Sequence, residues 1–130
     1  MAANHADFTL TFRRLGDAAA GPAGDAALRG LFADPGAYDE WAGRWRQRLG
    51  EEPVAPAARR AAMRAVNPAV IPRNHLVEAA LAAAVKSQDF APFDELLDVT
   101  SRPYEDRPEF ARYAEPPGPD QAIYQTFCGT

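Results

Sequence analysis

A chain of 130 residues is long enough to form one domain with its own core, and a net charge of −4 argues against a general nucleic-acid binder. Hydrophobic residues make up 47% of the chain, but many are alanines, so seven Phe, four Tyr and two Trp must supply much of the packing. The single cysteine excludes a disulfide within the chain, and neither a signal peptide nor an apolar run of bilayer length is present. We therefore expect a cytoplasmic protein with neither nucleic acid nor a membrane as its partner.

Charge is unevenly distributed along the chain. Residues 41–75 hold seven arginines against two glutamates, a balance of +5, whereas residues 86–130 hold four basic against nine acidic groups, a balance of −5. Two oppositely charged halves that face each other are the simplest interpretation.

The first predicted helix begins after Asp7, whose carboxylate can accept a hydrogen bond from a free backbone N–H. Its apolar face is formed by Phe8, Thr11, Phe12 and Leu15. Arg13 and Arg14 lie off that face. Residues 16–24 are small and predict a linker, after which Asp25 is expected to cap a short helix.

The next two helices have clear starts. Asp34-Pro35 combines a cap with a proline and predicts a helix that ends at Gly50. Its residues at spacings of three and four form an aromatic stripe, which is typical of core: Tyr38, Trp41, Trp45 and Leu49. Pro56 predicts the start of a further helix that runs to Val66.

The stretch from Asn67 to Leu76 is the centre of the sequence pattern. Pro68 disfavours helical geometry at the residue before it, and Pro72 suits the start of the next helix, so the chain should turn here around an apolar Ala-Val-Ile plug. Two interpretations are open. This segment is either a corner between helices with a buried plug, or Arg73 and Asn74 tie it to another part of a larger protein.

The second half predicts two more helices and an irregular end. The helix after Pro72 should be buried along a wide stripe: Leu76, Val77, Ala80, Leu81, Ala84 and Val85. Asp89 and Pro92 start a helix that closes before Arg102-Pro103, with Phe93, Leu96 and Leu97 facing inward. Beyond it, Tyr104, Phe110 and Tyr113 are expected to anchor a proline-rich strap.

These patterns predict an all-α protein, a small irregular helical domain with a proline-rich, extended C-terminal strap. Residues 1–101 form the helical region, and residues 102–130 form the strap and a cysteine-bearing tail, together making a single domain. No alternating pattern of a β-strand and no internal repeat is present in the sequence.

Residues that carry chemistry are sparse. No glycine-rich phosphate loop follows a strand, and His5, His75 and Cys128 are too few for a four-ligand zinc site. Neighbouring carboxylates, such as Asp39-Glu40, should point apart. A couple of Cys128 with His75 is conceivable, but their spacing does not favour it. Read alone, the sequence contains no active site.

Several ordered motifs nevertheless resemble one family. Residues 8–15, FTLTFRRL, resemble a YTLFFRRL stretch of the SelO (YdiU) proteins. The following segments resemble that family's C-terminal signature, in order: Asn67-Pro68 through Arg73-Asn74; Phe93, Leu96 and Leu97; Arg102-Pro103-Tyr104; and Pro108-Glu109-Phe110. Phe127-Cys128-Gly129-Thr130 resembles its end, where a cysteine or selenocysteine stands close to the last residue.

The resemblance implies a fold and an activity for a longer parent protein. SelO proteins are pseudokinase-fold enzymes that transfer AMP from ATP to protein hydroxyls, using a divalent metal. Their nucleotide-binding and metal-binding residues lie in an upstream kinase-like region, and none matches a residue here. The chain is therefore expected to be the C-terminal helical part of such an enzyme, with no catalytic, cofactor-binding or metal-binding residue and no activity by itself. ATP and Mg or Mn belong to the full-length parent.

The resemblance also implies roles for individual residues. Cys128 is the one functional position that maps, as a redox cysteine. Possible contacts to the kinase-like region are Arg59, Arg60, Arg64, Arg73 and Asn74. The implied partners are that upstream region and the protein substrates of the parent. Read without the resemblance, the four arginines form a phosphate-binding patch, a solvated face or salt-bridge partners of the acidic half. The alternative function is an autonomous helical protein-interaction module.

Overall fold

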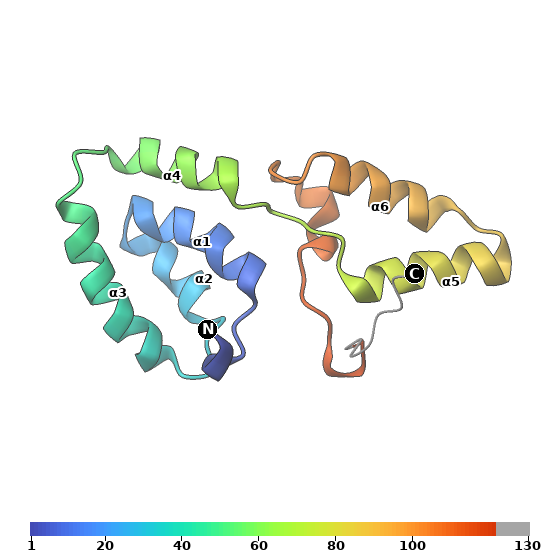
Figure 1. The fold of residues 1–130 in the computed structure, drawn as a ribbon, viewed down its shortest axis with the longest axis horizontal. Helices are drawn as coiled ribbons and strands as arrows, with labels where there is room; N and C mark the ends of the chain where they lie inside the picture. The colour runs from blue at the N-terminus through green and yellow to red at the C-terminus, as the bar shows by residue number, and fades with distance from the viewer. Residues whose placement is uncertain (122–130) are drawn as a thin grey trace, which may run out of the picture. The chain divides into compact units, whose positions relative to one another are not determined.

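A computed structural model describes residues 1–121, and within that range the protein is helical and contains no strand (Figure 1). The predicted all-α class is confirmed. The α-helices are α1 (Phe8–Ala20), α2 (Asp25–Arg29), α3 (Pro35–Gly50), α4 (Pro56–Val66), α5 (Asn74–Ser87) and α6 (Ala91–Ser101). Short 3-10 helices are η1 (Ala2–Asn4), η2 (Pro22–Gly24), η3 (Pro108–Tyr113) and η4 (Pro119–Gln121).

The chain divides into two compact units, and the division lies inside the proline-containing corner. The first unit is Met1–Ala69 and the second begins at Val70. The sequence predicted one domain with an internal division at residue 101. In the structure the described part of the strap packs with α5 and α6. The backbone N–H of Val70 donates to the carbonyl of Pro103, and η3 contacts α6.

Helix α1 is the centre of the first unit and contacts α2, η2 and α4. Asp7 is its N-cap, as predicted, and Oδ1 accepts a hydrogen bond of 2.8 Å from the backbone N–H of Leu10. The predicted linker from residue 16 is wrong, because α1 continues to Ala20. Gly16 is buried there against α4, where an added Cβ would lie 3.5 Å from the side chains of Met63 and Arg64. Close packing of two helices thus explains a glycine that the sequence suggested was a break.

The core of the first unit forms where α1, α2 and α3 meet. Its buried members are Leu15, Ala18, Leu28, Tyr38 and Ala42. Phe8 was expected in this face but is exposed, since it lies at the first position of α1. Asp25 is not the N-cap of α2. Its carboxylate instead accepts hydrogen bonds from Tyr38 and Arg46, at 2.6 Å each.

Helix α3 starts and ends where the sequence predicts, with Asp34 as its N-cap. The aromatic stripe is only partly core. Tyr38 is buried and Trp45 packs against the core, but Trp41 is exposed and stacks on Trp45 with ring centroids 5.1 Å apart. The prediction that the whole stripe is buried is therefore wrong for Trp41, which lies at the edge of the stripe, about 60° around α3 from Tyr38.

The second unit is built on an antiparallel hairpin of α5 and α6 (Figure 1). Helix α5 begins at Asn74 with Arg73 as its N-cap, two residues later than Pro72 predicted. Asp89 accepts a hydrogen bond from the N–H of Ala91 at the start of α6, which ends at Ser101 as expected. The buried cluster comprises Val70, Ala80, Leu96, Val99 and Tyr113.

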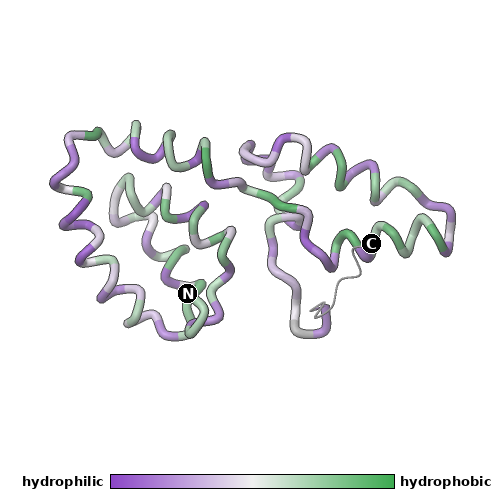
Figure 2. The backbone as a smooth tube through the Cα atoms, in the orientation of Figure 1, coloured by the Kyte–Doolittle hydropathy of each residue, from purple (hydrophilic) through white to green (hydrophobic). Residues whose placement is uncertain are grey.

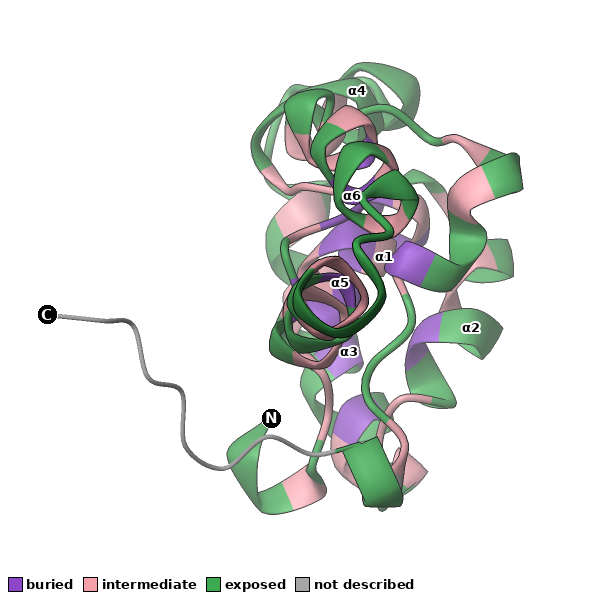
Figure 3. Ribbon diagram, turned by 90° about the vertical axis from the view of Figure 1, so that its right-hand side faces the viewer, coloured by how far each residue is buried: buried purple, intermediate pink, exposed green. Residues whose placement is uncertain are grey.

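Both helices of the hairpin are less buried than the sequence predicts. Of the wide stripe expected on α5, only Ala80 is fully buried, whereas Leu81 and Val85 are exposed. On α6, Leu96 faces inward but Phe93 and Leu97 do not. Figure 2 shows hydrophobic residues along much of α5, and Figure 3, which views the hairpin end-on, shows how much of both helices is exposed.

The strap is fixed to the hairpin by aromatic and ionic contacts. Phe110 and Tyr113 pack against the cluster as predicted, but Tyr104 is half exposed. Asp98 of α6 accepts hydrogen bonds from Arg102 and Arg107, at 2.9 and 2.7 Å. Hydrogen bonds from Arg107, and then from Arg102, hold the pKa of the Asp98 carboxyl below its usual value.

Two neighbouring leucines provide a matched test of this packing. Leu96→Ala removes a side chain that is 8% exposed and should lower the free energy of unfolding by about 2–4 kcal/mol. Leu97→Ala, at a position that is 58% exposed, should change it by less than about 0.5 kcal/mol in the isolated chain. Both tryptophans lie in the first unit, so the measurement is urea unfolding followed by circular dichroism together with amide hydrogen exchange in α5. Equal losses for both variants would contradict the placement of the core.

Candidate functional site

Three of the predicted arginines lie on α4 of the first unit and have partners within that unit. Arg60 Nε and Arg64 Nη2 lie 2.6 and 2.9 Å from Oδ1 of Asp17 on α1. Arg59 donates to the carbonyl of Leu49 at 2.9 Å and pairs with Glu52 at 3.6 Å. The basic edge of α4 therefore joins it to α1 and to the end of α3.

Asp17 is the acceptor that two cations share. Burial by itself raises the pKa of Asp17, but hydrogen bonds from Arg64 and Arg60 outweigh it, and the pKa lies below the ordinary 3.8. A hollow of about 460 Å³ adjoins these groups. It is lined by Ala20, Pro56, Ala57, Arg60, Ala61 and Arg64. Because both guanidinium groups already bind Asp17, a phosphate in this hollow would have to compete with a carboxylate that is held in place.

Arg73 and Asn74 belong to the second unit, at the start of α5. Arg73 is 7% exposed, and its Nη2 donates to the carbonyl of Ala114 at 2.7 Å. This bond joins the start of α5 to the end of η3. Asn74 is exposed as the first residue of α5. The predicted set of arginines is thus divided between the two units and forms no single patch within either.

Sequence reasoning missed the most buried arginine, Arg13, which was placed outside the packed face. It is 6% exposed, and its Nη1 donates to the carbonyls of Arg64 and Asn67, at 2.9 Å each. Both carbonyls lie at the C-terminal end of α4, where Pro68 prevents further helix and the last carbonyls lack backbone donors. The helix-ending Asn-Pro pair was a signal that a donor from elsewhere is needed.

Other helix ends in the first unit are closed in the same way. Arg14 donates to the carbonyl of Ala27 in α2, and Arg46 donates to the carbonyl of Ala18 in α1. A guanidinium at a helix C-terminus satisfies carbonyls that lack intrahelical partners and interacts favourably with the negative end of the helix dipole. Several arginines of the first unit thus have a structural use within that unit.

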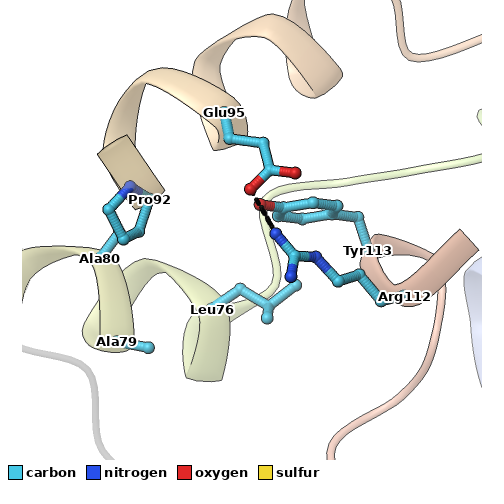
Figure 4. Close-up of a pocket in the computed structure, with 7 residues that line it drawn as sticks. All are labelled: Leu76, Ala79, Ala80, Pro92, Glu95, Arg112 and Tyr113. Carbon is cyan, nitrogen blue, oxygen red and sulfur yellow. Dashed lines mark hydrogen bonds and ion pairs between the residues drawn. The ribbon is translucent and has the colours of Figure 1, made fainter. Parts of the chain in front are cut away.

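The second unit contains a pocket of about 270 Å³ between α5, α6 and η3 (Figure 4). Apolar residues form most of its lining, which comprises Leu76, Ala79, Ala80, Pro92, Glu95, Arg112 and Tyr113. Arg112 forms an ion pair with Glu95 and donates to the hydroxyl of Tyr113 at 3.1 Å. Burial raises the pKa of Tyr113; the Arg112 hydrogen bond opposes this shift and Glu95 adds to it. The pocket can hold an apolar group beside one ion pair, but it contains no nucleophile paired with a base.

No group of three or more histidine, cysteine or carboxylate side chains within residues 1–121 is placed to hold a metal ion. Beside each hollow the charged groups form an internal ion pair: Arg60 with Asp17 at the first and Arg112 with Glu95 at the second. Cys128, the predicted redox residue, lies outside the described residues. In residues 1–121, no helix combines the length and the hydropathy that crossing a membrane requires.

Comparison with known proteins identifies relatives along the whole chain. The chain is 62% identical over 130 residues to "Protein nucleotidyltransferase YdiU" of Bradyrhizobium sp. and of Bradyrhizobium diazoefficiens. It is 60% identical over 136 residues to the protein of the same name from Methylorubrum extorquens. The chain belongs to the YdiU (SelO) family. No family model matches it.

The chain represents one part of the YdiU proteins. All of its residues align, but they span only 26–27% of the length of these relatives. It corresponds to the C-terminal region of the family, as the sequence motifs predicted. In this chain the residues that the motifs singled out at the corner lie where the two units divide: Asn67-Pro68 in the first unit and Arg73 in the second.

The Asp17 cluster predicts a specific dependence of stability on pH. Because the pKa of Asp17 is lowered in the folded state, its stabilising effect is present above its unfolded pKa and is lost as the pH falls through the folded value. Asp17→Asn should therefore lower the free energy of unfolding at neutral pH, and the difference from wild type should shrink below about pH 4. Urea unfolding followed by tryptophan fluorescence measures this in the first unit. Glu51→Gln, at an exposed pair with Arg48, is the control and should have little effect at any pH. A difference for Asp17→Asn that grows as pH falls would contradict the assignment.

The closure of α4 by Arg13 is tested by Arg13→Met. The variant keeps much of the side-chain volume but removes hydrogen bonds from a charged group, so the first unit should lose about 1.5–3 kcal/mol. Arg44→Met, which removes an exposed pair with Glu40, should cost less than about 1 kcal/mol. The same fluorescence-detected unfolding compares the two, and similar small losses would show that Arg13 does not stabilise the helix end.

Proposed function

We propose that this chain is the non-catalytic helical segment of a protein adenylyltransferase, in which it supports a kinase-like region. The full protein would transfer AMP from ATP to hydroxyl groups of protein substrates, with Mg or Mn as the metal. The observation that carries this proposal is the alignment of the whole chain with proteins named "Protein nucleotidyltransferase YdiU". The chemistry would come from the remaining three quarters of such a protein.

The interactions of the described residues favour a supporting role. The arginines of α4 and Arg13 bind carboxylates and helix ends of their own unit, which leaves them committed to structure. The pocket beside Tyr113 is small and mostly apolar, and its ion pair is internal. A segment of this kind would stabilise an attached domain through its surface.

Cys128 completes the proposal as a redox residue. Under an oxidant, its thiol would form a disulfide with a second cysteine thiol in the kinase-like region, and a dithiol reductant would reverse the reaction. Cys128 is the single cysteine of this chain, so the partner must come from outside it. In the full protein, Cys128→Ser would abolish any response of activity to reductant.

An autonomous protein-interaction module is the second candidate, and one observation favours it. Trp41 is 39% exposed and stacked on Trp45, beside the exposed Arg44 and Arg48 of α3. Tryptophan and arginine are enriched at the energetic centres of protein interfaces. Under this alternative the chain would bind a separate protein without any attached catalytic domain.

Transfer of labelled AMP distinguishes the two functions. A full-length protein that contains this chain should label a protein substrate in the presence of ATP and Mn, whereas the 130-residue chain alone should not. Deletion of this 130-residue segment from the full-length protein should reduce labelling to background. Trp41→Ala is the control. If the exposed side of α3 binds only a separate protein, this variant should leave AMP transfer by the full-length protein unchanged. Transfer by the pure 130-residue chain, or full activity after the deletion, would refute the proposed function.

A further inference from the structure

The α5–α6 hairpin has an apolar face that no described residue covers. Its members, here called the outer hairpin face, are Leu81, Val85, Phe90, Phe93 and Leu97. Val85 is 80% exposed and Leu97 58%. Monomeric proteins rarely leave large contiguous apolar surface in water, so a face of this composition is typical of an interaction site.

Helix geometry places these side chains together. Successive residues of an α-helix are about 100° apart, so Leu81 and Val85 share one stripe of α5, and Phe93 and Leu97 share one stripe of α6. Ala79 and Glu95 line the pocket on the other side of their helices. Leu81 and Val85 therefore lie on the side of α5 away from the pocket, and Phe93 and Leu97 lie on the side of α6 away from Glu95.

Among the described residues, the hairpin therefore has two apolar sides, of which η3 covers one. Phe110 and Tyr113 of η3 cover the inner side with the Leu96 and Val99 cluster. Figure 2 shows hydrophobic residues along much of α5. A helix that is hydrophobic on opposite sides is typical of an element buried between two layers. Glu78, Lys86 and Asp94 lie exposed on the same two helices, and Glu78, one turn before Leu81, borders the outer hairpin face. Its occupant must present an apolar surface.

We propose that the outer hairpin face docks against the remainder of the full-length protein, the three quarters of a YdiU-length chain that lie outside these 130 residues. This inference rests on the proposed function and specifies the surface through which the segment would support its parent. The length that the relatives carry beyond this chain supplies a body large enough to cover two helices. A body in the same polypeptide is also present at a high effective concentration, about millimolar for short linkers, which a second copy or a separate protein lacks.

Site-specific thiol labelling tests the proposal in the full-length protein. In a Cys128→Ser background, Leu97→Cys reports on the outer hairpin face and Ala111→Cys, exposed on η3, is the matched control. Labelling by a maleimide is read by mass spectrometry of the peptide that contains each position, and each rate is divided by the rate in urea. In the isolated 130-residue chain both positions should label at similar normalised rates. In the full-length protein the rate at position 97 should fall by about tenfold or more, and the rate at position 111 should not.

Each other outcome overturns the proposal. Equal labelling of position 97 in the two proteins would show that the remainder does not cover this face, and equal protection of both positions would show burial that is not specific to it. Protection in the isolated chain that grows with protein concentration would identify a second copy as the occupant. Protection there that is independent of concentration would show that another part of the 130-residue chain covers the face. The measurement requires no nucleotide transfer, so its result is separate from that of the activity assay.

Discussion

Arginine side chains that close helix C-termini are the interaction on which this structure most depends. The last carbonyls of a helix have no intrahelical donors, and in a chain of short helices they are numerous. Arg13 closes α4 and Arg59 bonds the last turn of α3 in the first unit, and Arg73 closes η3 in the second. Each guanidinium comes from a different element, so the bond that completes one helix also fixes a second helix beside it.

This use of arginine compensates for a core that is poor in large side chains. Alanine and glycine allow close contacts, such as that of Gly16 with α4, but they bury little area each. Within residues 1–121, the two units consequently have small buried clusters, centred on Leu28 and Tyr38 in the first and on Leu96 and Val99 in the second. Hydrogen bonds between elements, and the paired arginines on Asp17 and Asp98, supply specificity that packing alone would not.

The same use of arginine side chains within each unit also explains which groups are exposed at the surface. Most basic groups of α4 and of the strap are used within their own unit, whereas several of the largest apolar side chains of α5 and α6 remain exposed. Exposed apolar side chains gathered on one element are typical of a surface that another part of a protein covers. The membership of the chain in the YdiU family, over about a quarter of the relatives' length, agrees with that interpretation.

The sequence by itself determined the local features, because capping and proline effects act within a few residues. Asp7, Asp34-Pro35, Pro56 and the end of α6 at Ser101 were predicted correctly, as was the family from its ordered motifs. Burial was decided only by the tertiary structure. A periodic pattern defines a face but does not say whether anything covers it, so Trp41, Leu81 and Leu97 were wrongly placed in the core. The burial of Arg13 depends on carbonyls more than fifty residues away, and no local pattern contains that information.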